Sequence, residues 1–192
     1  MSTRSVPALV VVSGPPAAGK TTLARGIGQR LRLPLFTKDD LKESLYDSIG
    51  WDDLDSSRRF GKASIDLLFD IMELQLSAGQ GLFAESNFYA RYDPPRFRRL
   101  AERYRHRLVQ VYCAASDEAI VSRYRTRGAS GSRHPAHFDG ANVERLRQGL
   151  ADGIWEPLDM PGTLITVDTS SFEAVNLDYL VAEIEAVIYR RR

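Results

Sequence analysis

The amino-acid sequence predicts an α/β fold with a five-stranded parallel sheet flanked by helices. Short apolar runs alternate with longer helical patterns along the whole chain, which is typical of this class. The run ALVVVS at 8–13 is continuously apolar, as expected of a strand buried on both faces. No repeat, low-complexity tract or linker divides the 192 residues, so we expect a single domain over 1–192.

The first half of the chain predicts three strands and three helices. A helix at 20–32 follows the first strand, and LPLFT at 33–37 is a second, weaker strand. A short helix and a long helix come next, and Gly79 and Gly81 end the long one. LFAES at 82–86 is the third strand. The short helix is marked by Leu41, Leu45 and Ile49, and the long one by Phe60, Ser64, Leu67, Leu68, Ile71, Leu74 and Ala78.

Capping residues mark the helices of the second half. Asp93, before two prolines, opens a helix to about His106, and Ser116 caps the next helix. Ser170 with Glu173 forms a capping box for the last helix. The remaining elements are strands at 108–114 and 163–168 and a helix marked by Val143, Leu146 and Leu150.

The composition is that of an ordinary soluble protein. Hydrophobic residues make up 43% and charged residues 27%, and the formal net charge is +1. A charge so close to zero argues against nucleic-acid binding through overall attraction, so any basic patch is local. Cys113 is the only cysteine, and the first residues resemble neither a signal peptide nor a membrane span. We therefore expect a cytoplasmic protein with no membrane partner.

The segment GPPAAGKT at 14–21 fits the motif G-x-x-x-x-G-K-T, after a strand and at the start of a helix, as that motif requires. Its glycines let backbone N–H groups point at phosphate oxygens. Lys20 reaches the outer phosphates, and the Thr21 hydroxyl ligates Mg²⁺. The sequence thus predicts a P-loop NTPase with ATP and Mg²⁺ as cofactors. The expected nucleotide contacts are Gly14, Pro15, Pro16, Ala17, Ala18, Gly19, Lys20, Thr21 and Thr22.

The rest of the sequence favours a compact kinase among P-loop proteins. The N-K-x-D signature of switch GTPases is absent. The segment LSAGQ at 76–80 matches a signature of transporter ATPases, but it ends a helix here instead of opening one. The chain is also short for an oligomeric mechanical ATPase.

The segment TKDDLKE at 37–43 follows the second strand, at the edge where such sheets bind ligands. One interpretation is a helix start, with Asp40 and Glu43 as a capping box. That interpretation needs neither Asp39 nor Lys42. A phosphotransferase needs a carboxylate that orients the acceptor hydroxyl and takes its proton. We assign this role to Asp39, and a contact with an anionic or polar part of the acceptor to Lys42.

Four segments in chain order resemble a group of P-loop kinases that includes phage-type polynucleotide 5′-kinase, chloramphenicol phosphotransferase and zeta-toxin-like kinases. They are GPPAAGKTTLA, KDDLKESLYD, FAESNF and RYRTRG. The resemblance implies that Asp39 is a general base and that Lys42 holds a substrate phosphate. Polynucleotide kinases carry Asp-Thr-Asn where this chain has Glu85-Ser86-Asn87, which implies that Glu85 and Asn87 lie beside the acceptor or a Mg²⁺-bound water. A solvated acid at the strand end is the alternative for Glu85.

The segment RYRTRGASGSRHP predicts an arginine-bearing lid in a region of about 123–142. Arg123 and Arg127 are four residues apart and therefore share a helix face. By the resemblance, Arg127 is the lid arginine, and such arginines stabilise charge on the transferred phosphoryl group. Arg133 is a further candidate. A salt-bridged helix surface is the alternative for all three.

The helix predicted from 95 onwards carries Arg96, Arg99, Arg103 and Arg107 in one stripe. One interpretation is a solvated flank of a surface helix. The other is a contact with the phosphate backbone of a nucleic-acid acceptor.

Together these features predict an ATP- and Mg²⁺-dependent phosphotransferase that acts on a hydroxyl. The first acceptor class is a small metabolite, sugar or antibiotic, and the second is a polynucleotide 5′-hydroxyl. A regulatory protein that hydrolyses ATP slowly without transfer is a third reading. His134 and His137, without further ligands, do not predict a metal site.

Overall fold

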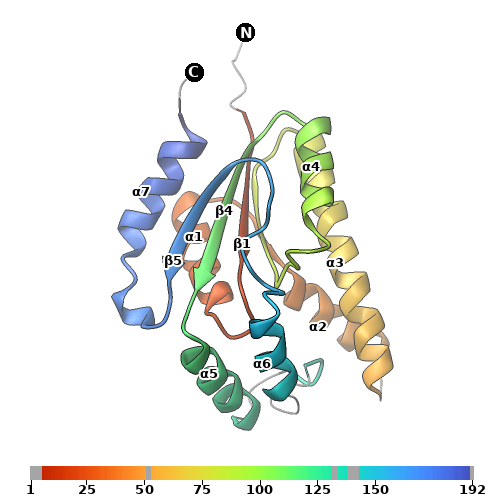
Figure 1. The fold of residues 1–192 in the computed structure, drawn as a ribbon. Helices are drawn as coiled ribbons and strands as arrows, with labels where there is room; N and C mark the ends of the chain where they lie inside the picture. Colours follow the sequence, from red (N-terminus) through yellow and green to blue (C-terminus); the bar gives the residue numbers. More distant parts are fainter. Residues whose placement is uncertain (1–5, 51–52, 131–133, 138–142, 191–192) are drawn as a thin grey trace.

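A computed structural model of the chain describes residues 6–50, 53–130, 134–137 and 143–190. It contains a five-stranded, fully parallel sheet in the order β2-β3-β1-β4-β5 (Figure 1). The predicted α/β fold class is confirmed. The strands are β1 Ala8–Ser13, β2 Leu35–Thr37, β3 Leu82–Glu85, β4 Arg107–Ala114 and β5 Thr163–Asp168.

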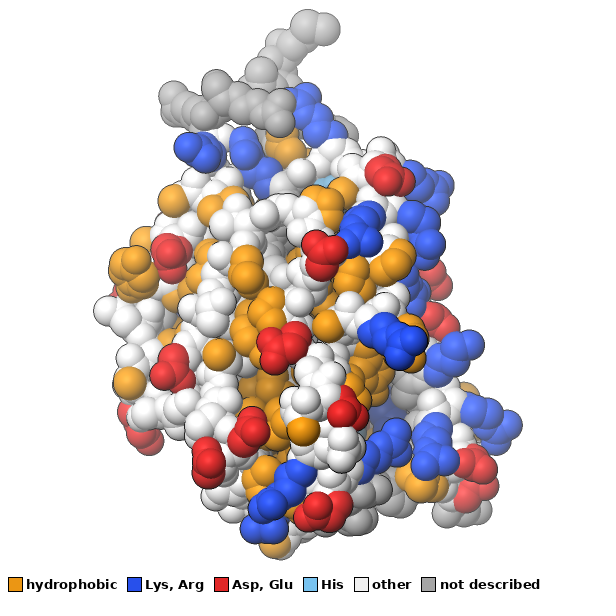
Figure 2. Space-filling view, in the orientation of Figure 1, with side chains coloured by type: hydrophobic (Ala, Val, Ile, Leu, Met, Phe, Trp, Pro, Cys, Tyr) orange, Lys and Arg blue, Asp and Glu red, His pale blue; other side chains and the backbone are white. Residues whose placement is uncertain are grey.

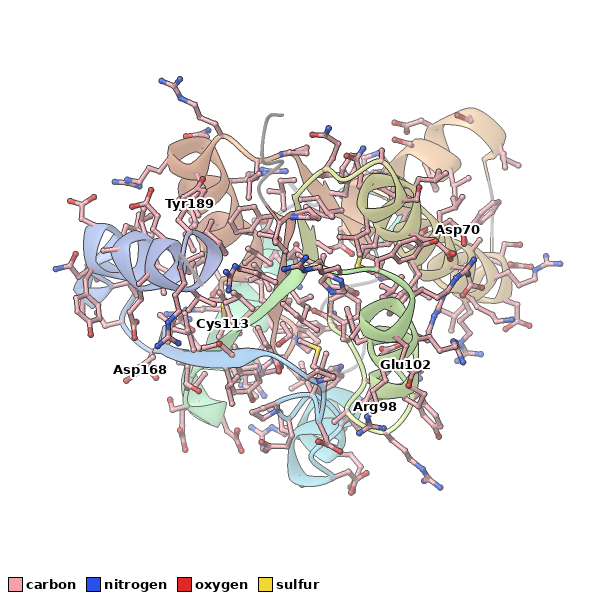
Figure 3. All side chains as sticks on the ribbon, turned by 90° about the horizontal axis from the view of Figure 1, so that it is seen from above. Asp70, Arg98, Glu102, Cys113, Asp168 and Tyr189 are labelled. Atoms are coloured by element: carbon pink, nitrogen blue, oxygen red, sulfur yellow. The ribbon has the colours of Figure 1, made fainter. Side chains whose placement is uncertain are left out.

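Helices cover both faces of the sheet. Seen end-on in Figure 3, one helical layer is formed by α1 and α7 and the other by α3 and α4. The helices α5 and α6 lie beyond the end at which the strands finish (Figure 1). Within the described residues, no helix is both long and apolar enough to cross a bilayer. The helices are α1 Lys20–Leu31, α2 Lys38–Ile49, α3 Leu54–Ser77, α4 Pro94–Arg103, α5 Asp117–Ala129, α6 Val143–Ala151 and α7 Leu177–Ile188, with a 3₁₀ turn at Phe172–Ala174.

The central strand β1 explains how two cores form on one sheet. All six of its residues are buried, as the continuous apolar run predicted. Successive side chains of a strand point to opposite faces. Val10 and Val12 accordingly pack in the cluster under α1 and α7, while Leu9 and Val11 pack under α3 and α4. The sheet is therefore held rigidly from both sides, which fixes the loops at its ends.

The buried face of α3 differs from the predicted stripe. Leu67 and Leu74 were expected inside, but they are 41% and 68% exposed. Leu68 is buried as predicted, together with Met72 and Leu76, which the predicted stripe did not include. These three residues also follow four-residue spacing, so the sequence offered two overlapping stripes, and packing against the sheet selects the second one.

One predicted helix cap is wrong and another is only partly right. Asp93 is the N-cap residue of α4, directly before two prolines, as predicted, but its side chain caps no helix N–H, because its Oδ2 accepts a hydrogen bond from the backbone N–H of Tyr89 (2.7 Å). Ser170 does not open the last helix, since its Oγ accepts from a backbone N–H just before α5 (3.0 Å). The N-cap of α7 is Asn176. In both cases the predicted cap stabilises a neighbouring loop instead.

The arginine stripe of α4 is also corrected. The helix ends at Arg103, and Arg107 belongs to β4, so the four arginines do not share one helix face. Arg96 forms an ion pair with Asp66 (2.9 Å), and Arg103 forms one with Glu73, both on α3. Lys and Arg side chains along this edge of the molecule are interspersed with acids (Figure 2). These contacts agree with the interpretation of α4 as a surface helix.

Candidate active site

A cleft of about 1030 Å³ opens where the parallel strands end. This is the edge at which open α/β sheets bind ligands, and the volume suits a nucleotide with a small second substrate. The cleft is lined by residues from the loop after β1, the start of α2, the end of β3, α5 and α6. The predicted site residues among them are Pro16, Ala17, Gly19, Lys20, Thr21, Thr22, Asp39, Lys42, Glu85, Asn87, Arg123 and Arg127.

The loop after β1 is curled by left-handed residues. Gly14 has φ 134°, Ala17 has φ 62° and Gly19 has φ 86°. A Cβ at Gly14 would lie 2.6 Å from the carbonyl oxygen of Cys113, so no larger residue fits there. Cys113 lies between the two helical layers (Figure 3). The curl is the geometry that aims backbone N–H groups at an anion.

The Lys20 side chain lies inside this curl. It is 5% exposed, and its Nζ donates a hydrogen bond to the carbonyl oxygen of Pro15 (2.7 Å). Burial lowers the pKa of Lys20, and the nearby Glu85 carboxylate opposes that shift. An ammonium group held within the loop is placed to meet the outer phosphates of a nucleotide.

Glu85 lies beside the loop at the end of β3. It is 4% exposed, and its Oε2 accepts a hydrogen bond from the Thr21 hydroxyl (2.8 Å). The alternative of a solvated strand-end acid is therefore wrong. Burial raises the pKa of the Glu85 carboxyl, an effect that the Lys20 charge partly offsets. A hydroxyl and a carboxylate in contact are the hard oxygen ligands that Mg²⁺ prefers.

The buried charge of Glu85 should lower the stability of the nucleotide-free protein. Because its pKa is raised on folding, the folded state binds the proton more tightly than the unfolded chain does. The contribution of the Glu85 carboxyl to stability is therefore greatest at acidic pH and falls as the pH rises above 4.5, the usual pKa of glutamate. We expect Glu85→Gln to raise the Tm of the nucleotide-free protein by about 2–4 °C at neutral pH, which corresponds to roughly 1 kcal/mol.

Differential scanning calorimetry at several pH values measures this effect. The difference in Tm between Glu85→Gln and the wild type should shrink towards acidic pH, where the protonated wild-type carboxyl is also uncharged. A glutamine variant that is less stable at neutral pH would contradict the view that burial destabilises the charged form of Glu85.

The start of α2 corrects the predicted capping box. The N-cap is Thr37, whose Oγ1 accepts a hydrogen bond from the backbone N–H of Asp40 (2.9 Å). The Asp40 carboxylate points away from the cleft, to Arg25 (3.3 Å). Neither acid at 39 and 40 is the N-cap of the helix, and the capping interpretation therefore does not account for Asp39.

Asp39 and Lys42 lie one turn apart on the cleft side of α2. The Nζ of Lys38 lies 3.4 Å from Asp39 Oδ1. Lys42 is the buried residue of α2, only 8% exposed, and its Nζ donates to the Ser57 hydroxyl (2.9 Å). The helix thus presents a carboxylate and an ammonium group side by side to the cleft.

Both predicted lid arginines reach the cleft from α5. Arg123 donates to the carbonyl oxygen of Ser170 (2.8 Å), which ties α5 to the loop after β5. The two helices α5 and α6 share a small apolar cluster formed by Ile120, Val121 and Leu146, separate from the two cores of the sheet. Arg133 lies outside the described residues, as do the other residues of 131–133 and 138–142 in the predicted lid region.

Other cleft residues carried no signal in the sequence. Ser57 comes from α3 and Trp155 from the segment after α6, and neither belongs to a motif. Trp155 lies against α6 at Gly149, where a Cβ would be 2.6 Å from the indole. His137 also lines the cleft, and its ring bonds to Glu43 of α2. No group of three metal-ligating side chains is present in the described parts of the chain.

Known proteins give the family and the fold. A family model described as an AAA domain matches residues 9–173. The crystal structure of a presumed kinase from Chloroflexus aurantiacus J-10-fl is 37% identical, with 94% of this chain and 95% of that chain covered and a TM-score of 0.82. None of the curated proteins that were compared matches the sequence.

More distant structures share the fold. A sugar kinase from Janibacter sp. HTCC2649 has 18% identity and a TM-score of 0.60, with coverage of 96% of this chain and 95% of that one. A gluconokinase from Sinorhizobium meliloti 1021 has 19% identity and a TM-score of 0.55, with coverage of 97% and 94%. The predicted membership of the P-loop kinase group is confirmed.

Proposed function

We propose that this chain, which belongs to the AAA domain family and is a P-loop kinase, transfers the γ-phosphate of ATP to a hydroxyl of a small molecule. One observation carries the proposal. The Lys20 ammonium group, the Thr21–Glu85 oxygen pair and the Asp39 carboxylate all line the same cleft. These are the groups that bind a nucleotide, hold its metal ion and activate an acceptor.

The nucleotide would bind to the curled loop at 14–22, with Lys20 on the outer phosphates. Thr21 and Glu85 fit a Mg²⁺ ion, because they offer a hydroxyl and a carboxylate 2.8 Å apart. When bound, the ion neutralises charge on the phosphates. Arg123 and Arg127 would then stabilise the charge of the transferring phosphoryl group from the side of α5.

Asp39 would act on the acceptor. Its carboxylate accepts a hydrogen bond from the acceptor hydroxyl and takes the proton as the oxygen attacks the γ-phosphorus. The new bond joins that oxygen to phosphorus, and the bond to the bridging β–γ oxygen breaks, so that ADP leaves. Lys38 Nζ, 3.4 Å from Asp39 Oδ1, places a positive charge beside this carboxylate.

The lining of the cleft favours a small molecule as the acceptor. Lys42, Asn87 and Trp155 contribute a cation, an amide and an aromatic ring to it, a mixture that suits a polyhydroxylated compound. The neighbours of known fold include kinases of a sugar and of gluconate. The pairing of Arg96 and Arg103 with acids of α3 argues against α4 as a contact for a polynucleotide acceptor.

Transfer from γ-labelled ATP in the presence of Mg²⁺ tests the proposal. The acceptors are a panel of neutral sugars, sugar acids and aminoglycoside antibiotics, a metabolite extract, and a 5′-hydroxyl oligonucleotide. We expect label in a small phosphate ester and none on the oligonucleotide. Label on the oligonucleotide alone would establish the polynucleotide alternative. Label in inorganic phosphate alone would support the interpretation as a regulatory ATPase without transfer.

A further inference from the structure

The segment 134–137 is packed into the site. Ala136 is fully buried, and the side chain of His137 is only 6% exposed. The carbonyl oxygen of Ala136 lies 3.5 Å from the Ser57 hydroxyl, which also accepts a hydrogen bond from Lys42. This four-residue segment therefore lies against both α2 and α3, next to the predicted acceptor contact.

Two histidines attach the segment to α2. His137 Nε2 lies 2.8 Å from Glu43 Oε1, and His134 Nε2 lies 3.1 Å from Asp47 Oδ1. Glu43 and Asp47 are four residues apart and thus share one face of the helix. Tyr46 adds an edge-on ring contact with His134 at 5.3 Å. Hydrogen bonds of imidazole to carboxylates are among the stronger ones in proteins.

The hydrogen bonds of His134 define its tautomer. Its Nδ1 accepts a hydrogen bond from the backbone N–H of Ala136 (3.1 Å), so in the neutral ring the proton is on Nε2. Nε2 then donates to Asp47. Both ring nitrogens are satisfied, and the ring fixes the turn of the segment as well as its attachment to α2.

The same helix carries both the chemistry and the attachment. Asp39 and Lys42 face the cleft from the first turns of α2, and Glu43 and Asp47 hold the histidines from the following turns. Because Ser57 contacts both the segment and Lys42, a displacement of the segment would also displace the Lys42 side chain. A fixed wall of this kind orients an acceptor and excludes water from the γ-phosphate.

We propose that His134 and His137 are positioning residues, which hold segment 134–137 as one wall of the acceptor pocket through Glu43 and Asp47. The inference rests on the proposed function, because it assigns the wall to the acceptor. It predicts that the acceptor, and not ATP, depends on the two imidazole–carboxylate pairs.

Matched double variants separate positioning from charge. Glu43→Ala with Asp47→Ala removes both acceptors of the imidazole hydrogen bonds. Glu43→Gln with Asp47→Asn removes the same charges but keeps an oxygen that accepts from imidazole. Asp40→Ala removes an acid of α2 that faces Arg25 instead, and serves as the control. Asp47→Ala alone changes a side chain that is 67% exposed, so folding is not at risk.

Steady-state kinetics with the acceptor found by the panel gives the main result. The double alanine variant should raise the KM for the acceptor by about tenfold and Asp47→Ala alone by a smaller factor, with the KM for ATP unchanged. The Gln/Asn variant and Asp40→Ala should stay close to the wild type. An unchanged acceptor KM in the alanine variants, an equal rise in both KM values, or an equally impaired Gln/Asn variant would overturn the proposal.

The rate of ATP hydrolysis without any acceptor tests the wall at 134–137 separately from the proposed transfer function. If the wild type labels nothing on the panel, the proposed function fails, but the wall can still be tested. Opening the wall should admit water and raise hydrolysis in the double alanine variant, and not in the Gln/Asn variant. Equal hydrolysis rates in all variants would overturn the inference on its own.

Discussion

Replacing Asp39 by asparagine is expected to lower phosphate transfer by about 10²–10⁴-fold, the range typical of a lost general base. Asparagine keeps the size of the side chain and can still touch the acceptor, but it cannot take the proton. ATP affinity should remain within about twofold of the wild type, because the nucleotide contacts come from a different loop. Transfer rates at saturating ATP, together with calorimetric ATP titration, measure both quantities.

The neighbouring Asp40 offers a matched control. Its carboxylate is 54% exposed and paired with Arg25, outside the cleft. Asp40→Asn removes the same charge from the same helix turn and should leave transfer unchanged. Equal losses in both variants would point to a general effect on α2. Full activity in Asp39→Asn would show that Asp39 is not the general base.

Replacing Lys20 by methionine should affect an earlier step. The side chain keeps its length and its place in the loop but loses the charge that meets the outer phosphates. Hydrogen bonds to charged groups contribute about 1.5–3 kcal/mol each, so the loss of contacts with two phosphates should weaken ATP binding by about 100-fold or more. Transfer would fall at least as far, since the same charge also stabilises the reaction.

Titration of the protein with a fluorescent ATP analogue measures this loss. Lys62→Met is the control, because Lys62 is an exposed lysine of α3 and does not line the cleft. ATP binding should be unaffected there. Unchanged binding in Lys20→Met would mean that the loop at 14–22 does not hold the nucleotide as proposed. The two variants at Asp39 and Lys20 thus separate the acceptor step from nucleotide binding.

Features determined by short stretches of sequence were predictable. The strand β1, the loop after it and the helix α1 are adjacent in the chain, and their motif contains all the residues that the geometry needs. The strands β1, β3 and β4 were found because apolar runs report burial on both faces of a parallel sheet. The placement of Asp39 in the cleft followed from its position directly after β2, since parallel strands bring their carboxyl ends to one edge.

Features that depend on distant contacts were not predictable. The buried Glu85 carboxylate accepts a hydrogen bond from the Thr21 hydroxyl, which lies 64 residues earlier. The attachment of His137 to Glu43 spans 94 residues, and two isolated histidines in a loop carry no sign of their partners. The unpredicted hydrogen bonds of Asp93 and Ser170 have a similar cause. A side chain such as Asp93 or Ser170 can accept from several nearby N–H groups, and the packing of the loops decides which one it reaches.

The central claim is that γ-phosphate leaves this cleft on the hydroxyl of a small molecule. ³¹P nuclear magnetic resonance of a reaction with ATP, Mg²⁺ and the small-molecule panel tests it most directly, because it records where each phosphate goes. If the protein transfers phosphate to a small molecule, a phosphate-ester signal should grow in step with ADP, with little inorganic phosphate. This signal should be absent for Asp39→Asn. Inorganic phosphate in step with ADP and no ester, in the wild type and in Asp39→Asn alike, would contradict it.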